Sequence, residues 1–313
     1  MRLLFVVDPP ETFKTYKDST YAMMVEAASR GHELYICLQE DLLLAEGAVF
    51  AHASRLTLTG NKPAWFALEA TVREKVAAFG AVIMRKDPPF DMEYFYSTHL
   101  LERAALQGAK VFNNPAAIRS HSEKLSIAEF PQFTAPTLAT RRGDELRAFV
   151  AEHDQAVFKP LDGMGGMGIF RVSKGEPNLS VIIETLGRDG HETIMAQKYL
   201  PAIKDGDKRI LVIAGKPVPF CLARIPKAGE TRGNLAAGGT GVARELTARD
   251  REIAETLGPI LWSRGLLLVG LDVIGESLTE INVTSPTCFQ EITQQTGFNV
   301  AGMFIDAVEA ASK

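Results

Sequence analysis

The sequence KPLDGMGGMG, residues 159–168, is the stretch that could bind a ligand most directly. Four of the six residues from 163 to 168 are glycines, so the backbone can adopt positive φ and leave its amide groups accessible. Lys159, at the end of a predicted strand, would add a point charge to those amides, and together they could surround phosphate. The alternative is a flexible surface hairpin without a ligand.

This loop differs from two common phosphate-binding patterns. A Walker A loop places Gly-Lys-Ser/Thr directly before a helix, and a Rossmann turn lies between a strand and a helix. Here residues 169–172, Ile-Phe-Arg-Val, follow the glycines and are typical of a second strand. The pattern therefore favours a glycine-rich hairpin that covers phosphates.

Two arginines on a second predicted hairpin could hold an anion. Residues 207–214 and 217–224 alternate around Gly215-Lys216, which is typical of a two-residue turn. In that register Arg209 lies opposite Leu222, and Arg224 lies within diagonal reach of Arg209. Guanidinium groups that close repel each other unless an anion lies between them. An anion site is therefore favoured over two unpaired surface arginines.

Asp272, Glu280 and Asn282 could bind a hard divalent cation. Glu280 and Asn282 are two apart on a predicted strand, so their side chains point to one face. If residues 275–277 form a three-residue turn, Asp272 falls opposite Glu280 and three oxygen ligands converge, as Mg²⁺ prefers. A two-residue turn would leave only the pair, and solvated polar residues on an exposed face are the alternative.

Polar residues also follow two predicted strands near the N-terminus. The first strand leads through Asp8-Pro9-Pro10 to Lys17-Asp18-Ser19, and a buried strand ends at Arg85 before Pro88-Pro89. Ligands of a parallel sheet bind where loops leave the carboxyl ends of the strands. The planar fork of Arg85 suits a carboxylate, although a solvated loop charge fits equally well.

These residues need a scaffold, and alternating strand and helix patterns predict a parallel sheet with helices on its faces up to about residue 120. We expect strands from residue 2 and at 33–38, 81–84 and 110–112, with helices at 19–30, 65–79 and 93–107. Further on we expect helices at 116–120, 122–129, 143–153, 178–186, 247–264 and 297–311, and strands at 193–200 and 266–274.

Two segments after the predicted parallel sheet, residues 122–129 and 226–241, have features that suggest a role in ligand binding. Lys124 falls in the first turn of the predicted helix 122–129, where its charge opposes the helix dipole unless an anion lies nearby. Residues 226–241 contain five glycines and no periodicity, which favours a lid over a disordered insertion because Arg224 directly precedes them.

Bulk properties restrict the class of protein. A chain of 313 residues with 46% hydrophobic residues predicts two or three lobes, and no apolar run approaches the roughly 18 residues of a membrane span. Cys37, Cys221 and Cys288 are too widely spaced for a disulfide framework or zinc site, which fits a reducing cytoplasm. The net charge of −4 argues against general nucleic-acid binding.

In chain order, these motifs resemble the ATP-grasp superfamily. The segments MRKDPPF, KPLDGMGG, YLPAIKDGDKR, CLARIP, ETRGNLAAGG and LTEINVTSPT are similar to prokaryotic glutathione synthetases, and the match covers essentially the whole chain. The resemblance implies an α/β fold, α+β overall. An N-terminal parallel-sheet lobe (1–120) would precede a central lid subdomain (121–200) and a C-terminal subdomain (201–313) with the metal site and a mobile loop (226–241).

The resemblance implies a role for each matching residue. The phosphates and adenine of ATP would contact Lys124, Lys159, Gly163, Met164, Gly165, Gly166, Met167, Gln197, Lys198, Tyr199 and Leu200, with Asp207 near the ribose. Metal ligands would be Asp272, Glu280 and Asn282. The catalytic positions would be Arg209, Arg224, Arg232 and Gly239. Substrate would contact Arg85, Asp18, Ser19, Gly238 and Ser285. The family often has Asn where Lys198 stands, a change that a main-chain contact would survive.

The implied activity is ATP-dependent joining of γ-L-glutamyl-L-cysteine and glycine through an acyl phosphate. The implied cofactors are ATP and Mg²⁺, with Mn²⁺ as a substitute, and the implied assembly is a cytoplasmic homotetramer without nucleic-acid or membrane partners. Two alternatives stay open: another ATP-dependent carboxylate–amine ligase, and a nucleotide-binding relative without turnover. The transfer-site arginines argue against the second alternative.

Overall fold

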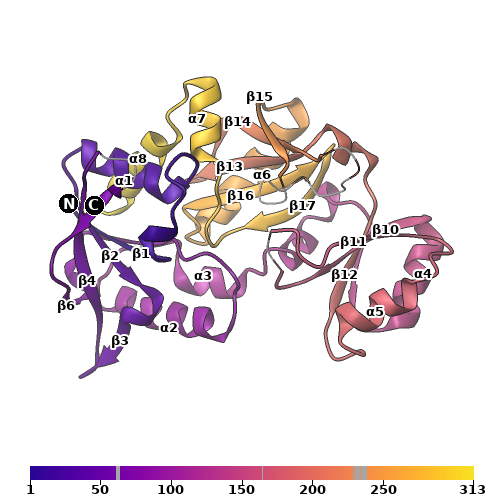
Figure 1. The fold of residues 1–313 in the computed structure, drawn as a ribbon, viewed down its shortest axis with the longest axis horizontal. Coiled ribbons are helices and arrows are strands. Elements are labelled where there is room, and N and C mark those ends of the chain that lie inside the picture. Colours follow the sequence, from indigo (N-terminus) through magenta and orange to yellow (C-terminus); the bar gives the residue numbers. More distant parts are fainter. Residues whose placement is uncertain (61–63, 164, 228, 230–232, 234–237) are drawn as a thin grey trace.

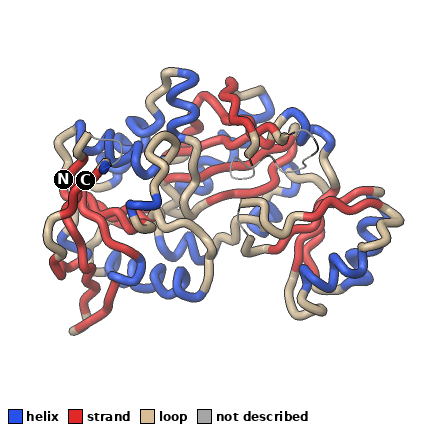
Figure 2. Tube along the Cα trace, viewed as in Figure 1, coloured by secondary structure: helices blue, strands red, loops and turns tan. Residues whose placement is uncertain are grey.

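The computed structural model describes residues 1–60, 64–163, 165–227, 229, 233 and 238–313. Its strands form three sheets that follow one another along the chain. In Figure 1 the sheet of the N-terminal residues lies at the left, the sheet of the C-terminal residues at the upper centre, and a smaller sheet with α4 and α5 at the right. Figure 2 shows helices beside each of these sheets.

The N-terminal sheet has the order β3-β4-β2-β1-β7-β8, with β5 and β6 paired to β4. Its parallel part is β1 (Arg2–Val7), β2 (Glu33–Leu38), β7 (Ala81–Met84) and β8 (Val111–Phe112). The apolar residues of β1 and β7 are almost fully buried, as expected for strands covered on both faces. The helices of this part are α1 (Ser19–Ser29), α2 (Met92–Leu106) and α3 (Pro115–Ser120).

The predicted helix over residues 65–79 was wrong. This segment contains β5 (Phe66–Leu68), β6 (Val72–Lys75) and a 3₁₀ turn at Val76–Ala78. Both strands pair antiparallel with β4 (Ala48–Leu58), which also pairs with β3 (Leu42–Ala45). The apolar spacing misled the prediction because Leu68 and Val72 are exposed and mark no buried helix face. The strand β4 is 11 residues long, so its backbone has hydrogen-bonding groups enough to pair with both β5 and β6.

The central sheet is antiparallel, with the order β11-β10-β12-β9. Its strands are β9 (Thr137–Thr140), β10 (Gln155–Pro160), β11 (Phe170–Ser173) and β12 (Ile194–Lys198). The helices α4 (Gly143–His153) and α5 (Leu179–Gly187) bury apolar residues against it in a separate core around Phe158. The predicted hairpin on both sides of the glycine-rich loop is confirmed, because Phe158 pairs with Phe170.

The third sheet has the order β15-β14-β13-β16-β17. Its strands are β13 (Asp207–Ile213), β14 (Lys216–Ile225), β15 (Thr240–Glu245), β16 (Leu268–Ile274) and β17 (Ser277–Asn282). Its helices are α6 (Ala248–Ser263), α7 (Phe289–Thr296) and α8 (Val300–Ala311). Buried residues of this sheet and of the N-terminal sheet belong to the same hydrophobic clusters, so the two sheets share a core.

Asn113 joins these two sheets through buried hydrogen bonds. Its side-chain amide donates to the carbonyl oxygens of Leu268 and Val283, both at 2.8 Å, and its side-chain oxygen accepts from the Leu268 amide at 2.8 Å. Because Leu268 begins β16 and Val283 follows β17, Asn113 fixes the strands of the third sheet to the end of β8.

Asn113→Ala should therefore destabilise the fold. The change leaves three buried backbone groups without their partner, and each costs about 1–3 kcal/mol. We expect the free energy of unfolding in urea to fall by roughly 3 kcal/mol or more. The control is Asn178→Ala, at an exposed helix N-cap whose side chain makes no capping hydrogen bond. An equal effect of both changes would contradict the proposed role of Asn113 in joining the two sheets.

Candidate active site

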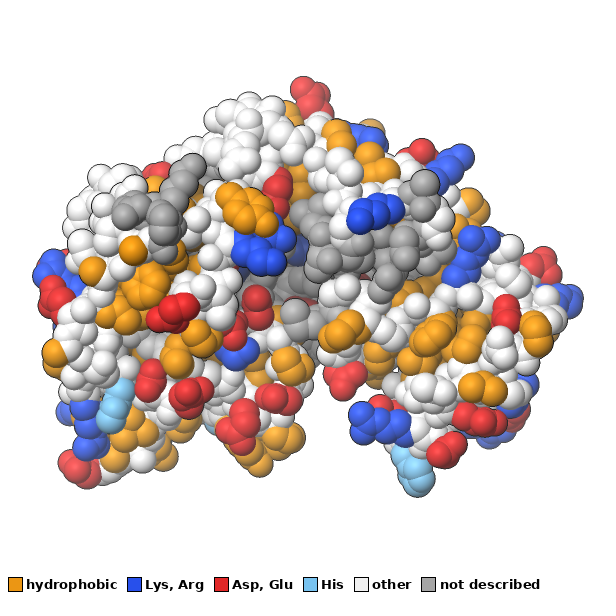
Figure 3. All heavy atoms as spheres, viewed as in Figure 1, with side chains coloured by type: hydrophobic (Ala, Val, Ile, Leu, Met, Phe, Trp, Pro, Cys, Tyr) orange, Lys and Arg blue, Asp and Glu red, His pale blue; other side chains and the backbone are white. Residues whose placement is uncertain are grey.

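A cavity of about 470 Å³ lies where the three sheets meet. The face in Figure 3 is hollowed near its middle, with Lys and Arg side chains nearby. Most of the predicted site residues line this cavity. They are Asp18, Lys124, Lys159, Gly163, Gly165, Gly166, Met167, Gln197, Lys198, Tyr199, Leu200, Asp207, Arg209, Arg224, Asp272, Glu280, Asn282 and Ser285.

The remaining predicted residues do not line it or are not described. Arg85, Ser19, Gly238 and Gly239 are absent from the lining. Met164 and Arg232 lie outside the residues that the structure describes. The functional roles of all these residues stay predictions.

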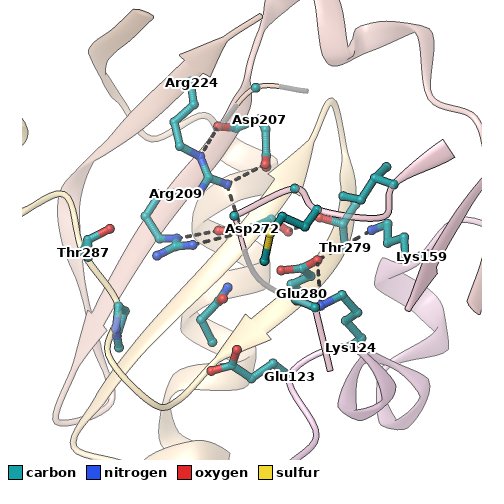
Figure 4. Close-up of a pocket in the computed structure, with 18 of the residues that line it drawn as sticks. Glu123, Lys124, Lys159, Asp207, Arg209, Arg224, Asp272, Thr279, Glu280 and Thr287 are labelled. Atoms are coloured by element: carbon teal, nitrogen blue, oxygen red, sulfur yellow. Dashed lines mark hydrogen bonds and ion pairs between the residues drawn. The ribbon is translucent and has the colours of Figure 1, made fainter. Parts of the chain in front are cut away.

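Two buried lysines approach one carboxylate. Lys124 and Lys159 are 5% and 7% exposed, and their Nζ atoms lie 3.9 and 3.8 Å from Glu280 Oε1. Lys124 also donates to the carbonyl oxygen of Gly163 at 2.6 Å, which ties it to the glycine-rich loop. Figure 4 shows both lysines pointing toward Glu280. Two cations beside one anion leave a local positive excess, which favours a further anion such as a phosphate.

The glycine-rich loop has the backbone freedom that its sequence suggests. Gly165, Gly166 and Gly168 have φ values of 65°, 81° and 69°, in the left-handed region that favours glycine. Gly163, Gly165 and Gly166 line the cavity next to Lys159. Backbone at these positions can approach a ligand closely, because no side chain stands in between.

Arg209 and Arg224 share one carboxylate. Arg209 donates to both oxygens of Asp272, from Nε at 2.5 Å and Nη2 at 3.1 Å. Arg224 Nη2 lies 2.9 Å from Asp272 Oδ2 and 2.5 Å from Asp207 Oδ2. The anion predicted between the two arginines is therefore, in this structure, the protein's own Asp272 (Figure 4).

The two carboxylates of this network differ in acidity. Burial would raise the pKa of Asp272, but the hydrogen bonds and charges of Arg209 and Arg224 hold that pKa below its ordinary range. Burial raises the pKa of Asp207 to about 6, against the opposing effect of Arg224. Asp207 can therefore change protonation near neutral pH, whereas Asp272 remains an anion.

A β-bulge determines which face Asp272 occupies. The turn between β16 and β17 has two residues, because Ile274 pairs with Ser277, so the three-residue turn was wrong. The register then shifts, and Asp272 pairs with Glu280 as the three-residue turn would have required. Thr279 is the extra residue in the bulge, and its hydroxyl donates to the Asp272 carbonyl at 3.1 Å.

Glu280 and Asn282 retain oxygen atoms that suit a hard cation. The Asn282 side-chain amide donates to the Gly270 carbonyl at 3.1 Å, which leaves its oxygen for a ligand. Both oxygens of Asp272 are already occupied by arginines. Among the described residues no group of three or more His, Cys, Asp or Glu side chains is arranged to hold a metal ion. Carboxylate and amide oxygens supplemented by phosphate oxygens fit Mg²⁺.

The other end of the cavity is lined by β12 and by residues after it. Gln197 donates to the Thr137 hydroxyl at 3.2 Å, and the Lys198 amide donates to the Pro136 carbonyl at 2.9 Å. The Arg171 guanidinium carbon lies 3.9 Å from the centre of the Tyr199 ring. These hydrogen bonds fix the end of β12, and the Tyr199 ring and the Arg171 guanidinium group together offer a flat surface on which an aromatic ligand could stack.

Arg85 lies behind the cavity wall. It is 5% exposed, and it donates to the Thr20 hydroxyl and to the Pro286 carbonyl, both at 3.0 Å. Burial lowers its pKa. Ser285, which does line the cavity, donates to Asp87 Oδ1 at 2.5 Å. Arg85 thus supports the segment that follows β17.

The Lys17–Ser19 loop is tied to the third sheet's helices. Asp18 is the N-cap of α1, where its carboxylate accepts from the Tyr21 amide at 2.7 Å, and burial raises its pKa. The Ser19 hydroxyl accepts from the Phe289 amide at 3.2 Å. These contacts place Asp18 in the lining and Ser19 outside it.

Several lining residues were not among those predicted from the sequence. They include Glu123, Thr279, Thr287 and Cys288. Glu123 lies next to Lys124 and Thr279 next to Glu280, so only proximity to a predicted residue could have indicated them. Thr287 ends the segment LTEINVTSPT and Cys288 follows it in the turn that leads into α7, so this segment was the signal that could have indicated both.

Solved structures share the whole fold. A D-cycloserine synthetase, DcsG, has a TM-score of 0.68 at 15% identity, covering 99% of this chain and 100% of that chain. An ATP-grasp ligase, PsnB, complexed with a minimal precursor, Mg and ADP has a TM-score of 0.65 at 17% identity, covering 99% and 98%. The fold is therefore that of the ATP-grasp proteins.

Sequence comparisons identify the family. The family model for the N-terminal domain of prokaryotic glutathione synthetase matches residues 1–119, and the model for its ATP-grasp domain matches residues 123–297. A glutathione synthetase of Ralstonia nicotianae is 63% identical over 100% of this chain and 96% of its own length. One of Nitrosomonas europaea is 59% identical over 99% and 98%. The chain belongs to the prokaryotic glutathione synthetase family.

None of the helices in the described residues is long and apolar enough to cross a membrane.

Asp207 generates a prediction about pH. Its pKa of about 6 in the folded chain exceeds its ordinary value of 3.8, so the folded chain binds more protons than the unfolded chain between these values. The free energy of unfolding should therefore fall as pH rises through this range, by at most about 1.4 kcal/mol per pH unit. Asp207→Asn cannot lose this proton. We therefore subtract the variant's free energy of unfolding in urea from that of the wild type. This value should fall from pH 4 to pH 6, and a constant or rising value would contradict the assignment.

Proposed function

We propose that the chain catalyses the ATP-dependent ligation of γ-L-glutamyl-L-cysteine and glycine, giving glutathione, ADP and phosphate through an acyl phosphate. Family membership over the whole chain supports this reaction. The observation that supports it most directly is that one cavity contains a glycine-rich loop, two lysines, oxygen ligands and two arginines. This combination suits phosphoryl transfer to a carboxylate.

The nucleotide would occupy the side of the cavity next to the central sheet. Lys124, Lys159 and the loop Gly163–Met167 would contact the phosphates, and Met164 of that loop lies outside the described residues. Adenine would lie against residues 197–200, with Asp207 toward the ribose. The local positive excess around Glu280 supports this orientation, since the phosphates would balance it.

Mg²⁺, or Mn²⁺ in its place, would be held by Glu280 and Asn282. A divalent ion would neutralise charge on the phosphate oxygens, which is the chemistry that such ions supply in phosphoryl transfer. Asp272, the third predicted ligand, already shares its negative charge with Arg209 and Arg224, so it would attract the ion less strongly than an unpaired carboxylate. Glu280 and Asn282 are therefore the stronger candidates as metal ligands.

Arg209 and Arg224 would face the transferred group. When the substrate carboxylate attacks the γ-phosphoryl group, negative charge develops on the transferring oxygens, and fixed cations stabilise it. Asp272 holds both guanidinium groups in place before a substrate binds. Attack by the glycine amine on the acyl phosphate then forms the amide bond and releases phosphate.

The acyl phosphate needs protection from water. We propose that the segment 226–241 supplies it, with Gly238, Gly239 and Arg232 near the bound substrates; Arg232 lies outside the described residues. Gly233 of the same segment already lines the cavity. A β-carbon at Gly233 would lie 2.4 Å from the Arg224 carbonyl oxygen, so only glycine fits this approach.

The dipeptide would occupy the side next to the N-terminal sheet. Asp18 and Ser285 are the predicted contacts that reach the cavity directly. Ser19 and Arg85 would act behind them, by holding α7 and the segment after β17. We further propose three domains at 1–120, 121–200 and 201–313, a homotetrameric assembly and a cytoplasmic location.

Phosphate release with defined substrates tests the reaction. The purified chain should release phosphate from ATP only when Mg²⁺, γ-glutamylcysteine and glycine are all present, with glutathione formed in equal amount. Phosphate release with a different pair of carboxylate and amine substrates would favour another carboxylate–amine ligase. Nucleotide binding without release from any pair would favour a non-catalytic relative, an outcome against which the intact arginine network argues.

Glu280→Gln should raise the Mg²⁺ requirement. The change keeps the size of the side chain but removes the charge that would bind the ion, so the Mg²⁺ concentration for half-maximal rate should rise by roughly tenfold or more. The matched control is Glu276→Gln, an exposed residue in the turn of the same hairpin. An unchanged Mg²⁺ requirement in Glu280→Gln would remove this residue from the ligand set.

A further inference from the structure

Glu123 fastens the segment that carries Lys124 to the metal-binding strand. We call residues 121–136 the connector, since they link α3 to β9. The connector runs beside β17, and its Thr134 forms a bridge with Leu278. At its other end the Glu123 carbonyl oxygen accepts from the Ile281 amide at 2.9 Å. Both ends of the connector are thus attached to one strand.

The Glu123 side chain continues this attachment beyond β17. Its Oε1 accepts from the amides of Val283 and Thr284 at 2.8 and 3.1 Å, and from the Thr284 hydroxyl at 2.9 Å. Val283 and Thr284 are 0% and 6% exposed, so these donors have little access to water. A charged carboxylate oxygen is well suited to take several donors at once.

These contacts enclose the predicted metal ligands. Glu280 and Asn282 stand on either side of Ile281, which is bonded to the Glu123 backbone, and Asn282 directly precedes Val283. Lys124 follows Glu123, and its Nζ lies 3.9 Å from Glu280 Oε1. Figure 4 shows Glu123, Lys124 and Glu280 around the same part of the cavity. The position of the lysine relative to the metal ligands thus depends on Glu123.

We propose that Glu123 is a positioning residue that holds Lys124 and the β17 ligands at a fixed separation, so that one nucleotide with its metal ion can bind both. This inference rests on the proposed nucleotide site. Without the carboxylate, the amides of Val283 and Thr284 would lose their acceptor, and the end of β17 could move relative to the connector. Binding of the metal–nucleotide complex should then weaken, whereas the chemical groups of the site would all remain.

Calorimetric titration with MgADP tests the proposal without requiring turnover. Glu123→Ala should raise the Kd for MgADP by on the order of tenfold, equal to about 1.4 kcal/mol. Glu123→Gln keeps an amide oxygen as acceptor, so its Kd should rise by no more than about threefold. Thr284→Val removes only the hydroxyl donor, so it should raise the Kd about as much as Glu123→Gln does. It provides a second test if Glu123→Ala does not fold.

Two further measurements separate positioning from general stability. Glu129→Ala is the matched control, because Glu129 lies on the same connector but pairs with Arg264 at 2.7 Å rather than with β17. Its MgADP affinity should equal that of the wild type. In rate measurements, Glu123→Ala should show a raised KM for MgATP, with most of kcat recovered at saturating MgATP.

Three results would overturn the proposal. They are an unchanged Kd in Glu123→Ala, an equal loss in Glu129→Ala, and a loss in Glu123→Gln as large as in Glu123→Ala, which would assign the effect to charge. If the wild-type chain binds MgADP but does not join the dipeptide to glycine, the proposed reaction is wrong. The comparison of MgADP affinities between variants stays valid in that case. The two failures are therefore distinguishable.

Discussion

The pairing of buried cations with a smaller number of carboxylates is the constraint on which the site depends. Burying a charge without a partner is costly, so each guanidinium and ammonium group in the cavity needs an anion. Asp272 satisfies Arg209 and shares Arg224 with Asp207, while Glu280 alone faces two lysines. Among the described residues the arginine network is therefore balanced within the chain, whereas the lysine cluster has room for a further anion. The arginine region is thus already paired within the chain, whereas the lysine region keeps an excess of positive charge.

The scaffold supports that arrangement by attaching all three sheets to β17, the strand that carries Glu280 and Asn282. The third sheet shares its hydrophobic core with the N-terminal sheet, and Asn113 bonds the two together. The central sheet has its own core, and it meets the other two through Met195, which belongs to one of their shared clusters, through the connector, and through Lys124, which reaches the glycine-rich loop. The side of the cavity next to the central sheet thus depends on a few contacts, whereas the opposite side depends on a large apolar core. Movement of the central sheet would change the first side more than the second.

Much of this organisation could be predicted from the sequence, and the errors have a physical cause. The glycine-rich hairpin, the parallel strands of the N-terminal sheet and the pairing of Arg209 with Leu222 were predicted correctly, whereas the antiparallel strands β3 to β6 of that sheet were not. In both functional hairpins, however, the turn was wrong: the first turn is at 214–215 rather than at Gly215-Lys216, and the second has two residues rather than three. A register shift in each hairpin restores the predicted pairing. Both turns were misplaced because a bulge forms through contacts with neighbouring strands and has no local signal in the sequence.

The bulge at Thr279 shows why such an irregularity is retained. Without the extra residue, the side chain of Asp272 would face Thr279 across the ladder, and Glu280 would point to the opposite side. Asp272 would then still bind Arg209, its own neighbour on β13, but Glu280 could not lie between Lys124 and Lys159. A regular hairpin would therefore divide the arginine network from the lysine cluster. One inserted residue places both on the same face of the sheet, and this common face is why the two groups of side chains line one cavity.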